Sequence, residues 1–213
     1  MVITAIERTR GRRGRVDVYV DGLARLQLGR ELVRMRRLRP GDFIETEQLE
    51  ALAEADARAS AMQAAVAMLA RRQHSEREVR RKLALRRVAT PIIEETIAKL
   101  LAARLIDDAE FARNWVQARD EASPRGRRLL TQELRMRGVQ VPVATAAAAA
   151  VADDEAAYRA AERRARSLAS LDHATFRSRM ASFLQRRGFG WETARAAIEH
   201  CWREIGGAVE FDD

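Results

Sequence analysis

The segment Leu134-Arg-Met-Arg-Gly-Val139 recurs twice along the chain, and its recurrence predicts the fold. Leu83-Ala-Leu-Arg-Arg-Val88 lies 51 residues before it, and Leu184-Gln-Arg-Arg-Gly-Phe189 lies 50 residues after it. In each copy a leucine is followed by another apolar side chain five positions later. Self-similarity at a period of about 50 residues is typical of tandem helical units, each of which buries its apolar face against its neighbours.

Signals for helix starts divide each copy into three helices. Ser75-Glu-Arg-Glu78 reads as a capping box, in which the serine hydroxyl and the second glutamate satisfy free backbone donors. Asp107-Asp-Ala-Glu110 reads as another capping box. Thr90 is the expected N-cap of a further helix, with Pro91 at its first position, where the missing amide costs nothing. The first and second copies are therefore expected to contain three helices each, as is the third.

Equivalent leucines and glycines define the expected core and helix ends. Leu83, Leu134 and Leu184 are predicted to be equivalent core residues, each deeply buried. Gly138 and Gly188 follow basic helices, at the place where a left-handed residue ends a helix. The other side chains expected to face inward are Val79, Ile93, Ile97, Leu100, Leu101, Phe111, Trp115, Phe183, Phe189, Trp191 and Trp202.

The first 45 residues follow a different pattern. Val2–Arg8 and Arg15–Val20 alternate apolar and polar side chains, and Asp21-Gly22 is a strong signal for a two-residue hairpin turn. Thr46 is expected to cap the first of nine helices. The predicted fold is mainly α, with three tandem three-helix repeats in an elongated curved body and a small β-rich N-terminal element. The expected divisions are a hairpin element at 1–45, a linking helix with the first repeat at 46–105, the second repeat at 106–152, the third at 153–205 and a tail at 206–213.

Charge is concentrated in the second helix of every copy. The chain holds 39 Lys and Arg residues against 31 Asp and Glu residues, a net charge of +8. The blocks 71–87, 125–137 and 177–187 have net charges of +6, +4 and +4. Such blocks are either solvated faces or a stripe that meets phosphate or acidic protein groups. The candidate binding residues are Arg71, Arg72, Arg80, Arg81, Arg86, Arg127, Arg128, Arg135, Arg179, Arg186 and Arg187.

Neither catalysis nor a cofactor is predicted. The chain has neither a GxxxxGK[ST] loop nor a strand-GxGxxG-helix unit, and its three histidines lack metal-site spacing. Cys201 follows His200, but neighbours on a helix point about 100° apart, so the cysteine is interpreted as a small core residue. The acids at 107–108 and 153–155 are interpreted as helix starts, where the helix dipole favours negative charge.

Four segments together resemble the RecX family, whose members regulate the recombinase RecA. They are Leu69-Ala-Arg-Arg-Gln-His-Ser-Glu-Arg-Glu-Val-Arg-Arg-Lys-Leu83, Leu105-Ile-Asp-Asp-Ala-Glu-Phe-Ala112, the run from Gly126 through Glu133-Leu-Arg-Met-Arg-Gly-Val139, and Phe183-Leu-Gln-Arg-Arg-Gly-Phe189. The resemblance covers about residues 60–205. The sequence departs from the family pattern at Arg87-Val88, where family members often have a Lys/Arg-Gly pair. The motif residues are Ser75, Glu78, Leu83, Asp107, Asp108, Phe111, Leu134, Gly138, Leu184, Gly188 and Phe189.

This resemblance implies a non-catalytic monomer that lies in the groove of a RecA–single-stranded-DNA filament. It implies restraint of ATP hydrolysis, strand exchange and coprotease activity, with single-stranded DNA contacted directly or through the filament. An alternative is a free-standing DNA-binding protein whose basic helices act as helix-turn-helix recognition helices. The longest weakly apolar run, residues 141–152, is shorter than the roughly 20 residues of a membrane span, so a cytoplasmic protein without a membrane partner is expected.

Overall fold

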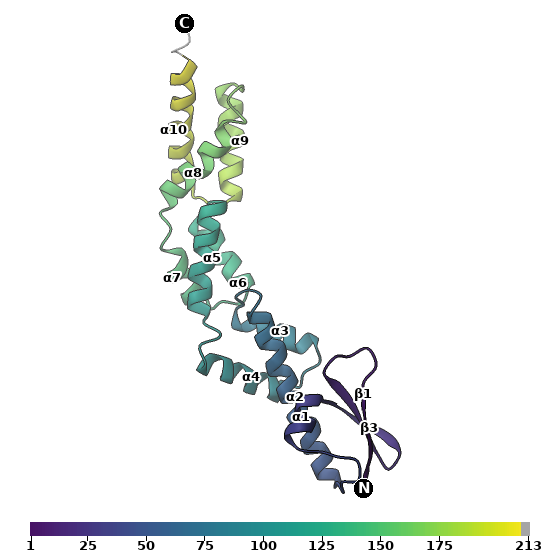
Figure 1. The fold of residues 1–213 in the computed structure, drawn as a ribbon. Coiled ribbons are helices and arrows are strands. Elements are labelled where there is room, and N and C mark those ends of the chain that lie inside the picture. The colour runs from purple at the N-terminus through teal and green to yellow at the C-terminus, as the bar shows by residue number, and fades with distance from the viewer. Residues whose placement is uncertain (210–213) are drawn as a thin grey trace. The chain divides into compact units, whose positions relative to one another are not determined.

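The chain folds into two compact units. The structure, a computed structural model, describes the backbone of residues 1–209 and the side chains of residues 1–205. The first unit contains Met1–Arg72 and Val79–Leu105, and the second contains Gln73–Glu78 and the chain from Ile106 onward. Figure 1 shows the order of the elements along the chain. Ten helices and three strands occur among the described residues.

An antiparallel sheet begins the first unit. It consists of β1 (Ile3–Arg8), β2 (Arg15–Val20) and β3 (Leu23–Gly29) in the order β1-β2-β3. Asp21 and Gly22 have φ angles of 52° and 77°, as a tight hairpin turn requires, so the predicted hairpin is confirmed. The pairing of β2 with β3 shifts its register between Val18 and Tyr19. This bulge explains why the leucines of β3 follow a period of two only in part.

Two helices follow the sheet, and one of them was not expected. Helix α1 (Arg30–Met35) buries only Leu32 and Val33, which are neighbours and therefore give no helical periodicity. The described residues therefore contain ten helices instead of the expected nine, and the additional one is α1. Helix α2 (Thr46–Leu69) has Glu45 as its N-cap, with Gln48 Oε1 accepting the Glu45 N–H at 2.9 Å, so Thr46 is its first helical residue.

Helices α3 and α4 complete the first unit. Helix α3 (Glu76–Leu85) contributes to this unit from Val79 onward, and α4 (Thr90–Ala102) packs against α2. Arg58 Nε of α2 bonds Glu95 of α4 at 2.8 Å. The N-cap of α4 is Ala89, so the expected cap at Thr90 is wrong by one residue.

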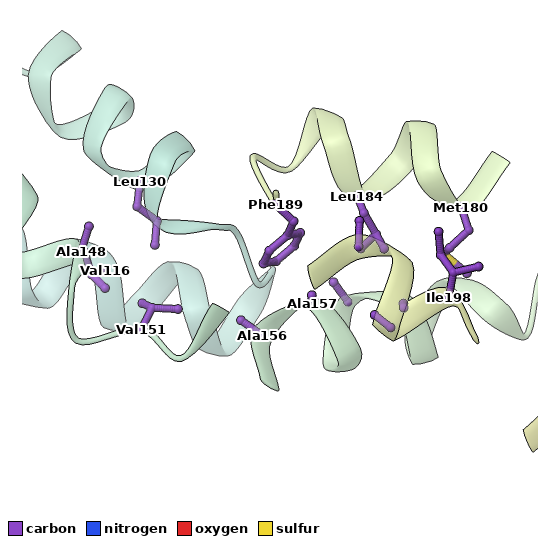
Figure 2. Close-up of a cluster of buried hydrophobic side chains, with 14 of the residues drawn as sticks. Val116, Leu130, Ala148, Val151, Ala156, Ala157, Met180, Leu184, Phe189 and Ile198 are labelled. Atoms are coloured by element: carbon purple, nitrogen blue, oxygen red, sulfur yellow. The ribbon is translucent and has the colours of Figure 1, made fainter. Parts of the chain in front are cut away.

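Six helices build the second unit around one continuous core. They are α5 (Asp108–Ala122), α6 (Arg127–Met136), α7 (Val141–Ala148), α8 (Asp153–Ala165), α9 (His173–Arg186) and α10 (Trp191–Val209). The core alternates large side chains such as Leu130, Met180 and Leu184 with alanines such as Ala156 and Ala157 (Figure 2). Small alanine side chains let helix axes approach closely, so alanine-rich helices are buried rather than exposed.

The predicted repeat is confirmed at the level of single buried positions. Leu83, Leu134 and Leu184 each have 0% of their surface exposed. Gly138 and Gly188 have φ angles of 94° and 84°, as expected for residues that end helices. Two further sets of equivalent buried positions lie on the third helices, namely Ile93, Ala144 and Ala194, and Ile97, Ala148 and Ile198.

Two expected core residues face solvent instead. Trp191 is 62% exposed because it is the first residue of α10, and Thr90 and Val141 at the same position of α4 and α7 are also exposed. Leu101 is exposed, and Thr96 is buried on α4, where its hydroxyl donates to the Ile92 carbonyl. Of the other aromatic side chains, Phe111 and Phe189 are buried, and Trp115, Phe183 and Trp202 are half-buried.

The C-terminal part of the chain is helical as far as Val209. The expected tail at 206–213 is therefore wrong for residues 206–209, which belong to α10, and residues 210–213 lie outside the described residues. Over the part of the chain that the structure describes, every helix is either too short or too polar to cross a membrane.

Candidate interface on the second helices

Most of the predicted binding arginines are exposed. Helices α3, α6 and α9 are the second helices of the three repeats, and their positive side chains differ in how far the fold engages them. Two of the eleven candidates, Arg80 and Arg187, are half-buried. The exposed ones are Arg71, Arg72, Arg81, Arg86, Arg127, Arg128, Arg135, Arg179 and Arg186.

Arg80 and Arg187 are engaged by the fold itself. Arg80 forms an ion pair with Glu94 of α4. The Arg187 guanidinium lies 4.6 Å from the centroid of the Phe183 ring and donates to Ser123 Oγ at 2.7 Å. Burial, together with the nearby charge of Arg163, lowers the pKa of Arg187. These contacts indicate that both arginines stabilise the fold.

A groove beside α6 is lined by four exposed arginines. It encloses about 1160 Å³ between α6 and the start of α7. Arg127, Arg128 and Arg135 of α6 line it together with Arg77, which precedes them by a full repeat. Among the described residues that line the groove, none is acidic. The structure therefore brings together three of the predicted arginines and adds a fourth that the sequence analysis missed.

Gly138 explains why Arg77 reaches this groove. A Cβ built on Gly138 would overlap the methylene groups of the Arg77 side chain, so only glycine leaves room for that stem. The signal that could have found Arg77 is the pairing of a helix-ending glycine with a long side chain one repeat earlier. Arg127 is more constrained, because its Nε donates to the Val151 carbonyl at 2.6 Å.

A buried polar network lies next to the groove and holds Arg137. Its guanidinium stacks 3.7 Å from the centroid of the Trp115 ring and bonds Glu78 at 2.7 Å. Trp115 Nε1 donates to Glu133 at 3.1 Å, and Glu133 also pairs with Arg125. Because Glu78 and Glu133 are buried and both bond to side chains of the fold, the network stabilises the fold rather than forming a binding surface.

The motif residues at the start of α3 contact this network. Ser75 Oγ accepts the Glu78 N–H at 3.2 Å, as the capping box predicts, and it donates to the Arg137 carbonyl. The Glu78 carboxylate lies 2.7 Å from His74 Nδ1 and also accepts from Arg137. Glu78 therefore connects the first turn of α3 to the C-terminal end of α6.

The acidic residues at helix starts accept backbone hydrogen bonds. Asp107 accepts from the N–H groups of Ala109 and Glu110 at 2.8 and 2.9 Å, as the predicted cap requires. Asp108 accepts from the Glu76 N–H at 2.8 Å. Asp153 accepts a hydrogen bond from the Arg127 N–H at 2.9 Å. A carboxylate of one helix thus caps the basic helix before it, twice along the chain.

Cys201 has the environment of a core residue. It is 1% exposed, and burial raises the pKa of its thiol to about 11, so the thiol is protonated at neutral pH. The His200 ring lies edge-on to Tyr158, with centroids 4.8 Å apart. Within the described residues, groups of three or more potential metal-ligating side chains do not occur.

Comparisons with known proteins agree on one family. Residues 61–100, 107–147 and 152–198 match the first, second and third three-helix domains of RecX. The chain is 33% identical over 142 residues to the regulatory protein RecX of Amycolatopsis mediterranei, covering 65% of this chain and 81% of the relative. It is also 33% identical over 123 residues to RecX of Geobacillus thermodenitrificans, covering 58% of this chain and 46% of the relative.

The matched segment thus spans about half the length of the Geobacillus relative, as it does for RecX of Levilactobacillus brevis, with 52%. A crystal structure of a regulatory protein RecX superposes with a TM-score of 0.68 at 22% identity. The superposition covers 93% of this chain and all of that one, which shows a shared fold.

Proposed function

Because the chain belongs to the RecX family of regulatory proteins, we propose that it binds RecA filaments on single-stranded DNA and restrains their activity. The restrained activities are ATP hydrolysis, strand exchange and coprotease activity. The protein acts by binding and catalyses no reaction itself. It does so as a monomer in the bacterial cytoplasm, with the recombinase filament as its partner.

The observation that carries this proposal is the repeated display of exposed arginines on equivalent helices. Arg81 of α3, Arg128 and Arg135 of α6, and Arg179 and Arg186 of α9 are all exposed. Consecutive equivalent helices present the same kind of surface several times along the chain. Such a series suits a partner that is itself repetitive and carries phosphates or acidic side chains, as a recombinase filament on DNA does.

Co-sedimentation with recombinase filaments tests the proposal directly. RecA is assembled on oligodeoxythymidine with a non-hydrolysable ATP analogue, and binding is compared with that to the naked oligonucleotide at near-physiological salt. A filament regulator binds the filament more tightly than naked DNA. Tighter binding to naked duplex with a sequence preference would instead support the helix-turn-helix alternative.

Charge reversal on one helix at a time tests the arginines. The variants are Arg81→Glu with Arg86→Glu, Arg128→Glu with Arg135→Glu, and Arg179→Glu with Arg186→Glu. The matched control is Arg113→Glu with Arg166→Glu, which changes the same charge at exposed positions. At least one test variant should need about tenfold more protein to inhibit RecA ATP hydrolysis, which corresponds to about 1.4 kcal/mol. Full inhibition by all three folded variants would remove the arginines from the mechanism.

A further inference from the structure

We propose that the groove between α6 and α7 directly binds the phosphodiester backbone of a single-stranded nucleic acid, with unpaired bases lying against Met136 and Val141. This inference deepens the proposed function and rests on it, because it names the component of a recombinase–DNA filament that this surface contacts. It also makes the three basic helices unequal, with α6 as the helix that contacts nucleic acid.

Three of the four arginines that line the groove carry uncompensated charge, whereas Arg127 lies 4.0 Å from Asp153. Arg77, Arg128 and Arg135 are exposed, and none of them forms an ion pair or a side-chain hydrogen bond with another described residue. A guanidinium presents a planar fork of donors that matches phosphate oxygens. Three such groups around one groove without acidic lining residues therefore favour a ligand with several consecutive negative charges.

The arginine supplied by the preceding repeat is special to this groove. At Gly138, the overlying residue is Arg77, whose stem occupies the space that a Cβ would fill. At Gly188, the equivalent glycine of the third repeat, the overlying residue is Leu129. The residue packed on the helix-ending glycine is therefore a cation beside the α6 groove and an apolar side chain at the equivalent place on α9.

The helix positions themselves also differ. The positions of Arg128 and Arg135 are occupied by Ser178 and Gln185 on α9, 50 residues later. On α3, Arg77 itself occupies the position of Arg128, but Ala84 occupies that of Arg135, and the neighbouring Arg80 is paired with Glu94. The α6 groove is therefore the place where phosphate-binding chemistry is most complete.

Apolar side chains beside the arginines favour a single strand over a duplex. Met136 is 73% exposed and Val141 is 50% exposed, and both line the groove. The faces of unpaired bases pack on apolar and polarisable side chains, whereas a duplex keeps those faces stacked inside. An acidic protein segment is the competing occupant, and the experiment separates the two.

The test measures binding of fluorescein-labelled oligodeoxythymidine to the full chain, without recombinase, by fluorescence anisotropy over a series of salt concentrations. Each phosphate contact of a single strand contributes about 0.7 to the slope of log affinity against log salt. Arg128→Gln with Arg135→Gln should therefore lower that slope by about 1.4 and weaken binding at low salt by at least about tenfold. The control, Arg113→Gln with Arg166→Gln, should leave the slope unchanged.

A further variant tests the contact with bases. Met136→Ser should weaken binding of the single strand about threefold or more without changing the salt slope, since it removes no charge. A duplex of the same length should be unaffected by this substitution. Circular dichroism confirms that each variant is folded before it is compared.

Two outcomes overturn the inference. One is an unchanged salt slope in the Arg128 and Arg135 variant, and the other is an equal loss of slope in the control. If that variant binds oligodeoxythymidine normally but no longer restrains RecA ATP hydrolysis, the groove contacts protein, and the proposed function survives without this inference. If the wild-type chain shows the expected slope but does not bind recombinase filaments, the proposed function fails and the groove assignment stands.

Discussion

Helices α6 and α9 end in the same backbone conformation, but different side chains pack on the two ends. Both helices end at a glycine with positive φ, Gly138 and Gly188, and both glycines lie under a residue from the preceding repeat. At Gly138 that residue is Arg77, and at Gly188 it is Leu129. The backbone conformation is therefore the same in both repeats, whereas the side chain packed on it changes from charged to apolar.

The arginines next to these glycines show the same contrast. Arg137 stacks on Trp115 and bonds Glu78, whereas Arg187 stacks on Phe183 and bonds Ser123. Both are held by an aromatic ring and a hydrogen-bond acceptor, but the partners come from different places in the repeat. Arg137 and Arg187 therefore stabilise the fold through matching contacts, whereas arginines without an ion-pair partner among the described residues, such as Arg77, are the better candidates for binding.

The largest predicted effect tests whether the repeats are equivalent in their cores. Leu83→Ala, Leu134→Ala and Leu184→Ala should each lower the free energy of unfolding by about 2–5 kcal/mol, because each side chain is fully buried and leaves a cavity. Urea denaturation measures the change. A loss below about 0.5 kcal/mol at all three positions would contradict the assignment of equivalent core residues.

A smaller effect is expected at the two glycines. Valine at either position is strained at positive φ, and it also meets the overlying residue. The nearest atoms to the new Cβ include the Arg77 Cβ at Gly138 and the Leu129 Cβ at Gly188, and a Cβ cannot move away by side-chain rotation. Gly138→Val and Gly188→Val should therefore each cost about 2–4 kcal/mol.

Thermal and urea unfolding of the two glycine variants provide the measurement. Gly190→Val is the control, because Gly190 does not have a positive φ and a Cβ added there would meet no described atom within 4 Å. If Gly138→Val and Gly188→Val unfold like the wild type, neither the positive φ nor the overlying residue requires glycine at these helix ends.

Repeat spacing and capping signals predicted most of the fold. They located the buried leucines, the left-handed glycines and the hairpin, because each depends on local sequence and on burial of a regular face. Helix α1 was missed since two neighbouring apolar residues, Leu32 and Val33, carry no periodicity. The predicted burial of Trp191 is wrong because its place as the first residue of α10 exposes it, although tryptophan is usually a core residue.

The candidate site was less predictable than the fold. Sequence could not separate Arg186 from Arg187, although one is exposed and the other is half-buried on Phe183. Charge alone also did not single out Arg77, whose place in the groove depends on its contact with Gly138 of the next repeat. Charge blocks identify a basic helix, but only tertiary packing decides which of its arginines are engaged by the fold.

The smallest predicted effect compares two ways of capping a basic helix. Helix α3 uses Asp108 of α5, the first helix of the next repeat, which accepts from the Glu76 N–H at 2.8 Å. Helix α9 uses its own N-cap, Asp172, which accepts from the Thr175 N–H at 3.1 Å. Burial raises the pKa of the Asp108 carboxyl, whereas hydrogen bonds from Thr175 lower the pKa of the exposed Asp172 carboxyl.

These opposite shifts predict opposite pH dependences of stability. A carboxyl whose pKa is lowered by folding stabilises the protein above its unfolded pKa of about 3.9, and the gain is lost as pH falls through the folded pKa. A carboxyl whose pKa is raised contributes most below about 3.9, and the gain is lost as pH rises through the folded pKa. The free energy of unfolding is measured in urea from about pH 2.5 to pH 6. Asp172→Asn should reduce the loss of stability as pH falls toward about 2.5, and Asp108→Asn should reduce the loss of stability as pH rises above about 4. If both variants change the pH dependence of stability equally and with the same sign, Asp108 and Asp172 do not differ in the direction of their pKa shifts.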